Sequence, residues 1–178
     1  MNYIVSVDGG GTKTQLTISD LSGNILGNNK TGSSNYKSVG IDVAYENLNM
    51  GLEEIYKDLN INKENIRMAV FGISGCDSQD DYEIILNIIK KTGLKEEQIY
   101  LYNDGVLAFY AQADEPGLVI ISGTGSIVLG INSYGRILRS GGWGYNFSDL
   151  GSGYEIGRKA LRETVMVVEN IPYYLIIY

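Results

Sequence analysis

The sequence predicts an α/β protein built from one structural unit that occurs in full once and then begins a second time. A glycine-threonine hairpin carries the repeat, because Thr12 and Thr124, like Gly23 and Gly135, lie 112 positions apart. Repetition of this kind indicates a unit that is built twice. Strand and helix patterns follow in the order βββαβαβα, and the second half repeats the opening βββ.

The first three elements are expected to form an antiparallel meander. Residues 3–7 alternate between apolar and polar side chains and are rich in β-formers, so they predict a strand that ends at Asp8. Residues 15–19 and 25–30 continue the pattern, and a turn over 20–24 joins them.

Helices and parallel strands are then expected to alternate. Apolar residues at helical spacing predict an amphipathic helix over 41–59, and a short apolar run over 67–73 is typical of a buried parallel strand. A second helix is expected over 80–91, with lysines in its last turn. A strand over 99–102 and a short helix ending near 112 complete the unit.

A break at residues 113–117 separates two expected domains, 1–113 and 114–178. The second domain starts like the first, with three strands between 118 and about 139 and a helix over about 153–169. It stops after that helix, and the apolar end over 171–178 is unusual for a free terminus. We therefore expect one complete domain and the first part of a second, in a chain that is a fragment.

Composition indicates a globular protein and excludes several classes of function. Hydrophobic residues make up 44% of the 178-residue chain and charged residues 20%, which is ordinary for a soluble domain. The net charge of −7 disfavours a nucleic-acid partner. The sequence has neither a signal peptide pattern nor an apolar stretch long enough to cross a bilayer, so we expect a cytoplasmic protein without a membrane partner.

The chain contains no histidine, and Cys76 is its single cysteine. Catalytic triads that depend on histidine, metal sites that use imidazole and internal disulfides are thereby excluded. A carboxylate is then the leading candidate for a proton acceptor at neutral pH. The search narrows to aspartates and glutamates at strand ends and in loops.

The run Asp8-Gly9-Gly10-Gly11-Thr12-Lys13-Thr14 lies where the first expected strand turns into the second. Glycines there allow close approach of the backbone and positive φ, and successive N–H groups form a nest for an anion. Asp8 at the strand end suits a magnesium ion held through water. A tight hairpin with a capping aspartate is the plainer alternative, and the pattern is not a Walker loop because a strand follows it.

Two further loops carry candidate site residues. The run 122–126 (Ser-Gly-Thr-Gly-Ser) is the repeat partner of the first loop, although alone it also fits a simple glycine-rich turn. Asn103-Asp104-Gly105 ends a strand near the domain break, where α/β sheets bind their ligands. Asp104 is therefore a candidate catalytic residue, and a cap for the following helix is the alternative.

The only tryptophan, Trp143, lies between glycines in the loop Gly141-Gly142-Trp143-Gly144. A tryptophan outside any periodic segment suits stacking on a ligand such as the face of a sugar ring. Asp149 follows six residues later, and either orients hydroxyl groups of a ligand or caps the last helix.

Taken together, both hairpins, the Asn-Asp-Gly run and the Gly-Gly-Trp-Gly run resemble the N-acetylglucosamine kinases. These form part of the BadF/BadG/BcrA/BcrD ATPase family, within the superfamily of sugar kinases, heat-shock proteins and actin. The resemblance reaches to about Arg162. It implies a ribonuclease-H-like, actin-type ATPase fold, with magnesium-ATP bound in a cleft and γ-phosphate transferred to a sugar hydroxyl, usually on C6.

The resemblance also implies a role for each matching residue. Asp104 matches the catalytic base, which also contacts the sugar. The residues that match nucleotide-binding positions are Asp8, Gly10, Gly11, Thr12, Lys13, Gly123, Thr124 and Gly125. The residues that match amino-sugar contacts are Asn35, Trp143, Gly144 and Asp149. The implied cofactors are ATP and Mg²⁺, with Asp8 on the ion through water.

Three alternatives stay open at this point. An activator ATPase of 2-hydroxyacyl-CoA dehydratases or benzoyl-CoA reductase belongs to the same group but bridges an iron–sulfur cluster through cysteines, and here only Cys76 is present. A sugar-binding fragment without turnover is the second, because the family's adenosine-binding loop lies farther on. Self-association as a homodimer is the third. The sequence does not distinguish N-acetylglucosamine from glucosamine, N-acetylmuramate or N-acetylmannosamine.

Overall fold

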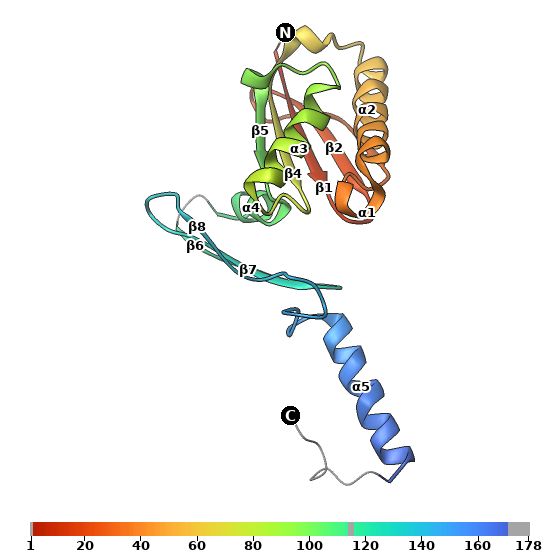
Figure 1. The fold of residues 1–178 in the computed structure, drawn as a ribbon. Helices are drawn as coiled ribbons and strands as arrows, with labels where there is room; N and C mark the ends of the chain where they lie inside the picture. The colour runs from red at the N-terminus through yellow and green to blue at the C-terminus, as the bar shows by residue number, and fades with distance from the viewer. Residues whose placement is uncertain (1, 114–115, 171–178) are drawn as a thin grey trace. The chain divides into compact units, whose positions relative to one another are not determined.

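A computed structural model describes residues 2–113 and 116–170 of the chain. The chain divides into two compact units, Met1–Ala111 and Gln112–Tyr178. The first unit holds a five-stranded sheet and the second a three-stranded sheet (Figure 1). Two residues of the expected domain break, 114 and 115, and the apolar end over 171–178 lie outside the described residues.

The five expected strands of the first unit all form. They are β1 (Tyr3–Gly9), β2 (Thr14–Asp20), β3 (Ile25–Thr31), β4 (Ile66–Ile73) and β5 (Ile99–Tyr102). Their order in the sheet is β3-β2-β1-β4-β5. The strand β2 is antiparallel to β1 and β3, whereas β4 is parallel to β1 and β5. The carboxyl ends of β1, β3, β4 and β5 therefore meet at one edge, which we call the carboxyl edge.

The three expected helices of the first unit also form, with ends within a few residues of expectation. They are α2 (Ile41–Asp58), α3 (Gln79–Lys90) and α4 (Asp104–Tyr110). The short helix α1 (Tyr36–Val39) and the 3₁₀ turns η1 (Lys63–Asn65) and η2 (Glu96–Gln98) were not expected. Segments of three or four residues are too short to show a helical period.

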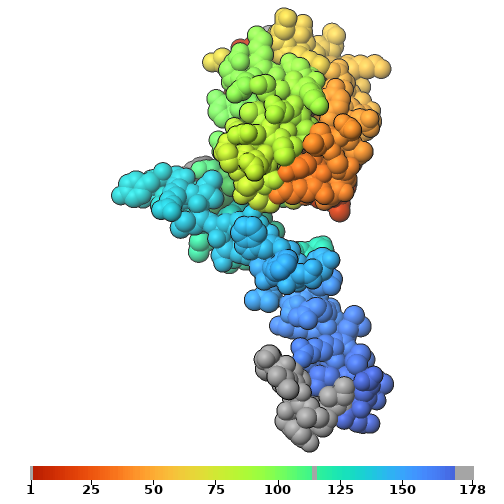
Figure 2. Space-filling model, in the orientation of Figure 1, coloured from red at the N-terminus to blue at the C-terminus, as the bar shows by residue number. Residues whose placement is uncertain are grey.

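The core of the first unit lies between the sheet and the helices α2 and α3. The helix α2 packs on β2, β3 and α3, and α3 packs on β5. Apolar side chains from each layer are almost fully buried there, among them Val7, Leu16, Leu48, Phe71 and Ile85. The surfaces of α2, in orange, and α3, in yellow-green, are continuous in the space-filling view (Figure 2).

The opposite face of the sheet is covered at the carboxyl edge by α4. Successive residues of a strand point to opposite faces, so Gly72 faces away from the core that holds Phe71. A Cβ atom on Gly72 would lie 2.7 Å from Cβ of Leu107 in α4. A glycine is required at this point because the helix backbone approaches the strand so closely that Asp104 Cα would be 3.3 Å from that atom.

The second unit contains the expected meander and helix. Its elements are β6 (Gly117–Ser122), β7 (Ser126–Ile131), β8 (Ile137–Gly141) and α5 (Gly153–Val168). Leu118 and Leu138 flank Gly130 in the sheet register, and both leucines are exposed. No helix of the described ranges is both long and apolar enough to cross a membrane.

Candidate active site

The first glycine loop closes the turn between β1 and β2. The Gly10 N–H donates to the Lys13 carbonyl at 2.9 Å, and Ser33 Oγ donates to the Gly10 carbonyl at 3.0 Å. Residues 11–13 are exposed, so the Thr12 hydroxyl and the Lys13 ammonium project from a loop whose base is fixed. This is the arrangement that an anion-binding loop needs.

The three glycines of this loop do not have the positive φ that the sequence led us to expect. These glycines matter instead for the room that a missing Cβ atom leaves. A Cβ atom on Gly9 would lie 2.2 Å from Ser34 Oγ and 2.5 Å from Ile73 Cδ1, whereas one on Gly11 would have no heavy atom within 4 Å. Gly9 lets a neighbouring loop pack on the strand, and Gly11 leaves open space above the turn.

Asp8 and Asp104 lie at the same edge of the sheet. The register aligns Asp8 with Gly72, and Gly72 with Tyr102, across β1, β4 and β5. Asp104 follows Tyr102 by two residues and begins α4 beside Gly72. Parallel pairing thus brings together two carboxylates that are 96 positions apart in the chain.

Asp104 is not the helix cap. Asn103 occupies that position, and its Oδ1 accepts from the Gly105 N–H at 3.0 Å. The same N–H contacts Asp104 Oδ1 at 3.0 Å, and Oδ2 has no hydrogen-bond partner within the described part of the chain. One carboxylate oxygen is therefore available to accept a proton.

The surroundings of Asp104 make it a stronger base than an ordinary aspartate. Burial raises the pKa of the Asp104 carboxyl, and the negative charges of Asp8 and Asp77 raise it further, while the Gly105 N–H opposes them. A base whose pKa lies nearer to neutral pH removes a proton more effectively.

Asn35 lies at the same edge, in the loop between β3 and α1. Its side chain caps α1 by accepting from the Lys37 N–H at 3.0 Å. Asn35 Nδ2 approaches Ser74 Oγ at 3.5 Å, so it meets the loop that follows β4. Gly75 in that loop has φ of +90°, and a Cβ atom there would be 2.8 Å from Asn35 Oδ1. The loop after β4 therefore accommodates Asn35 only with glycine at this position.

The second glycine loop, Gly123 to Gly125, joins β6 to β7 in the second unit. The Gly123 N–H donates to the Gly125 carbonyl at 2.9 Å, and the Gly153 N–H donates to the Gly123 carbonyl at 2.8 Å. Gly153 opens α5, so the loop rests against the positive end of a 16-residue helix. Thr124 at its tip is exposed. Helix amino ends of this kind favour bound phosphate groups.

Asp149 lies against this second loop. A Cβ atom on Gly125 would be 2.9 Å from Asp149 Oδ2, and Asp149 Oδ1 is buried without a hydrogen-bond partner among the described residues. Asp149 does not cap α5, because Ser152 occupies the cap position and its side chain accepts from the Glu155 N–H at 3.1 Å. A buried carboxylate oxygen without a donor is a position where a ligand hydroxyl or N–H would be stabilising.

Trp143 is 64% exposed in the glycine-rich loop that follows β8. The Arg139 guanidinium lies 4.5 Å from the centre of its indole ring, a cation–π contact. Its backbone N–H donates to Ser148 Oγ at 2.7 Å, and Gly144 next to it has φ of +88°. The indole is held from one side and is largely exposed to solvent.

The expected site residues fall into two sets, one in each unit. At the carboxyl edge of the first sheet lie Asp8, Gly10, Gly11, Thr12, Lys13, Asn35 and Asp104. In the second unit, Asp149 lies against the second glycine loop of Gly123, Thr124 and Gly125, and Trp143 and Gly144 lie in the loop that follows β8. Asp77 and Asn103 were not predicted as site residues, yet they lie at the same edge as the first set, where Asn103 Nδ2 donates to Asp77 Oδ1 at 3.1 Å. The signal was available, since both follow the ends of parallel strands.

Asp8 is the candidate metal ligand of the first set. No group of three His, Cys, Asp or Glu side chains that could hold an ion occurs in the described ranges. The single exposed carboxylate of Asp8 fits an ion such as Mg²⁺, which keeps most of its waters and takes its other ligands from phosphates.

Cys76 is a partly buried thiol. Burial raises the pKa of its thiol to about 11, with Asp77 and Asp81 adding to the effect, so the thiol stays protonated at neutral pH. The thiolate is the form that binds metal.

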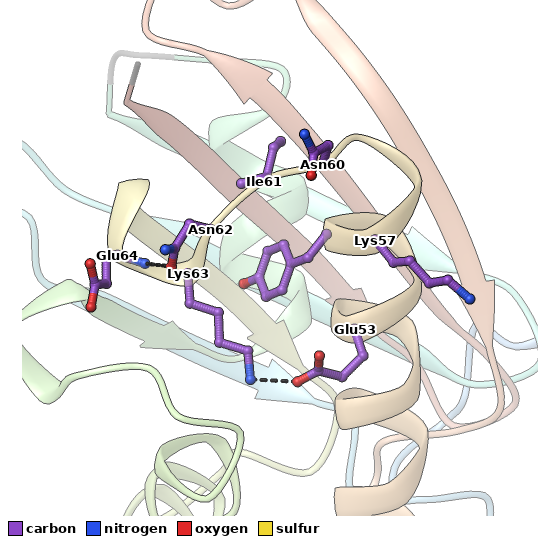
Figure 3. Close-up of a pocket in the computed structure, with 8 residues that line it drawn as sticks. Glu53, Lys57, Asn60, Ile61, Asn62, Lys63 and Glu64 are labelled. Carbon is purple, nitrogen blue, oxygen red and sulfur yellow. Dashed lines mark hydrogen bonds and ion pairs between the residues drawn. The ribbon is translucent and has the colours of Figure 1, made fainter.

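A cavity of about 600 Å³ lies in the first unit, between the end of α2 and the turn η1. Figure 3 shows Glu53 and Lys63 joined across it by an ion pair. Its charged lining is balanced, because it contains two lysines, Lys57 and Lys63, and two glutamates, Glu53 and Glu64. None of the expected site residues lines this cavity.

Asp81 is expected to make stability pH-dependent. Burial would raise the pKa of this carboxyl, but hydrogen bonds from Lys37, Tyr36 and Ser78 outweigh it and hold the pKa well below the usual range. The folded pKa lies below the unfolded one, so this stabilisation is present above about pH 4 and is lost as pH falls further. Asp81→Asn should lower the free energy of unfolding by about 1–3 kcal/mol at pH 7.

Urea denaturation followed by far-UV circular dichroism between pH 3 and 7 measures both effects. The difference between wild type and Asp81→Asn should shrink toward pH 3. A difference that stays constant over this range would show that the Asp81 charge does not stabilise the fold.

Known proteins resemble this chain over most of its length. The BadF/BadG/BcrA/BcrD ATPase family matches residues 5–169. An N-acetylmuramic acid/N-acetylglucosamine kinase of Clostridium acetobutylicum is 36% identical over 163 residues, which is 91% of this chain and 53% of the relative. An N-acetyl-D-glucosamine kinase of Dictyostelium discoideum is 34% identical over 176 residues, 94% of this chain and 55% of the relative.

A crystal structure supports the fold. It is that of a Chromobacterium violaceum protein provisionally named an N-acetylglucosamine kinase, with a TM-score of 0.74 and 24% identity, and it covers 95% of this chain and 59% of that one. The fold is therefore the expected ribonuclease-H-like, actin-type ATPase fold. The chain spans about half the length of the curated relatives it matches. By the match over residues 5–169, the chain belongs to the BadF/BadG/BcrA/BcrD ATPase family.

Proposed function

We propose that this chain carries the acceptor site and both phosphate loops of an ATP-dependent sugar kinase. The reaction transfers the γ-phosphate of ATP to a hydroxyl, that on C6, of N-acetylglucosamine or a related amino sugar. The observation that carries the proposal is Asp104, a carboxylate of raised pKa at the carboxyl edge beside Asp8, one oxygen of which has no hydrogen-bond partner among the described residues. The names of the two curated relatives support the same substrate class.

Each site residue then has a chemical task. Asp104 accepts the proton of the attacking hydroxyl, and Asn35 orients the sugar with a hydrogen bond. The backbone N–H groups of residues 11–13 and 124–125, with the Lys13 ammonium, bind the phosphate oxygens, while Gly10 and Gly123 close the two turns with their own N–H groups. Phosphoryl transfer rests mostly on such positioning and charge stabilisation. Mg²⁺ neutralises phosphate charge when bound, and Asp8 is the carboxylate that would hold its water. Residues 1–113 form the acceptor domain and 114–178 carry the second phosphate loop.

A coupled assay of ADP release tests this function. The assay compares the 178-residue chain with a chimaera in which this chain replaces the matched part of the Clostridium acetobutylicum kinase. N-acetylglucosamine, glucosamine, N-acetylmuramate and N-acetylmannosamine serve as acceptors, and phosphorus NMR identifies the phosphorylated hydroxyl. Absence of turnover by the chimaera with every acceptor would refute the proposal, provided that the chimaera is folded.

A second candidate is a sugar-binding chain without turnover of its own. It is favoured by one observation, namely that the chain covers 53–55% of its curated relatives. The two candidates differ in the same assay. Turnover by the chimaera but not by the 178-residue chain at millimolar ATP would support the second.

Trp143 is expected to report on the sugar. It is the only indole in the chain, and one side of its ring is free of the Arg139 guanidinium. Stacking on a pyranose ring should change its emission. Titration with N-acetylglucosamine should therefore give a saturable change in tryptophan fluorescence, and gluconate should give none. A flat titration with binding detected by calorimetry would mean that Trp143 does not contact the ligand.

The second unit is expected to make the chain self-associate as a homodimer or larger species. Leu118, Ile120 and Leu138 expose one face of the three-stranded sheet, and Leu161, Val165 and Val168 form a stripe along α5. Contiguous exposed apolar surface favours association by about 25 cal/mol per Å² buried. Light scattering should show a mass above 19.5 kDa that rises with concentration. A monomer at every concentration would contradict this expectation.

A further inference from the structure

Three loops meet at the carboxyl edge of the first sheet, and Asp77 lies in the middle one. The loop after β3 carries Asn35 and leads into Lys37, and the loop after β5 carries Asn103 and Asp104. Asp77 Oδ1 accepts from Asn103 Nδ2 at 3.1 Å, and Asp77 Oδ2 lies 3.5 Å from Lys37 Nζ. One carboxylate therefore contacts both neighbouring loops.

Asp81, in the first turn of α3, connects the loop after β4 to the residues that follow β3. It accepts from Tyr36 Oη at 2.6 Å, from Lys37 Nζ at 2.8 Å and from the Asp77 N–H at 3.2 Å. Its side chain is only 8% exposed. The loop after β3 and the loop after β4 are thus tied to the same buried carboxylate.

These contacts join the two residues on which the proposed reaction depends. Lys37 follows Asn35 by two residues, and its N–H is the donor that Asn35 Oδ1 accepts. Asn103 precedes Asp104, and Asn103 Oδ1 holds the Gly105 N–H that opens α4. The path from the sugar-binding asparagine to the base runs through Lys37, Asp77 and Asn103.

We propose that Asp77 is a positioning residue for the acceptor site, which it holds in shape by tying the loop of Asn35 to the loop of Asp104, with Asp81 and Lys37 as its anchor. The inference rests on the proposed function for its role in sugar binding. Reacting groups must be placed closely, since displacement by about 1 Å can cost about 10²-fold in rate. Neither Asp77 nor Asp81 needs to touch the sugar for this role.

The labelling rate of Cys76 measures, without any ligand, whether Asp77 holds the two loops together. It is the only thiol in the chain, it precedes Asp77, and it is partly buried. Release of the loop in Asp77→Ala should raise its labelling rate with a disulfide reagent at pH 8 about tenfold, because exposure and a lower thiol pKa both speed the reaction. Asp80→Ala removes an exposed charge from the same turn and should change the rate less than about twofold.

Sugar affinity tests the positioning role on the same 178-residue variants. Calorimetry with N-acetylglucosamine should give a Kd raised about tenfold in Asp77→Ala, the loss expected for about one hydrogen bond. Asp77→Asn keeps an oxygen that accepts from Asn103 and should restore most of the affinity. Thermal unfolding confirms that each variant is folded.

The outcomes separate the two ideas. An unchanged labelling rate in Asp77→Ala would show that Asp77 does not hold the two loops together. Faster labelling with an unchanged Kd overturns the positioning role, as does a failure of Asp77→Asn to restore affinity. A wild-type chain that binds no sugar refutes the proposed function instead, and the labelling rates then still decide whether Asp77 holds the loops together.

Discussion

Asp104→Asn is expected to lower kcat by roughly 10²–10⁴, the usual contribution of a general base. The substitution keeps the size of the side chain and the oxygen that contacts the Gly105 N–H, so α4 should begin as before. It removes the oxygen that accepts the proton of the sugar hydroxyl. The affinity for N-acetylglucosamine should stay within a few-fold, because an amide can still form hydrogen bonds to the hydroxyl.

Initial rates and calorimetry on the chimaera measure the two quantities separately. Asp58→Asn is a matched control, since Asp58 is an exposed carboxylate at the end of α2, away from the carboxyl edge. A near wild-type kcat in Asp104→Asn would assign proton acceptance to another group. A parallel loss of kcat and affinity would indicate instead that Asp104 mainly binds the sugar.

Gly9→Ala is expected to destabilise the first unit by about 1–3 kcal/mol, the usual cost of inserting a methyl group into a packed region. The new Cβ atom would lie 2.2 Å from Ser34 Oγ, whose serine is 2% exposed. Ser34 Oγ also accepts from Thr14 Oγ1 at 2.9 Å, so moving it breaks a buried hydrogen bond. Urea denaturation of the 178-residue chain measures the loss.

Gly11→Ala is the matched control for this substitution. Its Cβ atom would meet no heavy atom within 4 Å, so the free energy of unfolding should stay within about 0.5 kcal/mol of wild type. If the first loop binds phosphate, the same methyl group should weaken ATP binding to the chimaera. Equal stability losses at both positions would contradict the packing role of Gly9. Unchanged ATP affinity in Gly11→Ala would mean that ATP does not occupy the open space above the turn.

The sequence by itself was enough to determine the order of the strands, and of the helices of seven or more residues, in both units. Alternation predicted β1, β2 and β3, and helical spacing predicted α2 and α3, because each pattern reflects which side chains of one segment face the core. The repeat between the two glycine loops located both turns. Strand ends directed attention to Asp8 and Asp104 for the same reason, since polar residues there break an apolar run.

Only the tertiary structure decided how these residues meet. Asp8 and Asp104 come to one edge through the register of β1, β4 and β5, and the steric role of Gly9 depends on Ser34, which is 25 positions away. Asp77 follows the end of a strand and Asp81 forms a capping box with Ser78, so each had a local signal, but the contacts that join the loops involve partners 26 to 45 residues away in sequence. Periodicity reflects the environment along one segment, whereas contacts between loops are fixed by which strands pair and in what order.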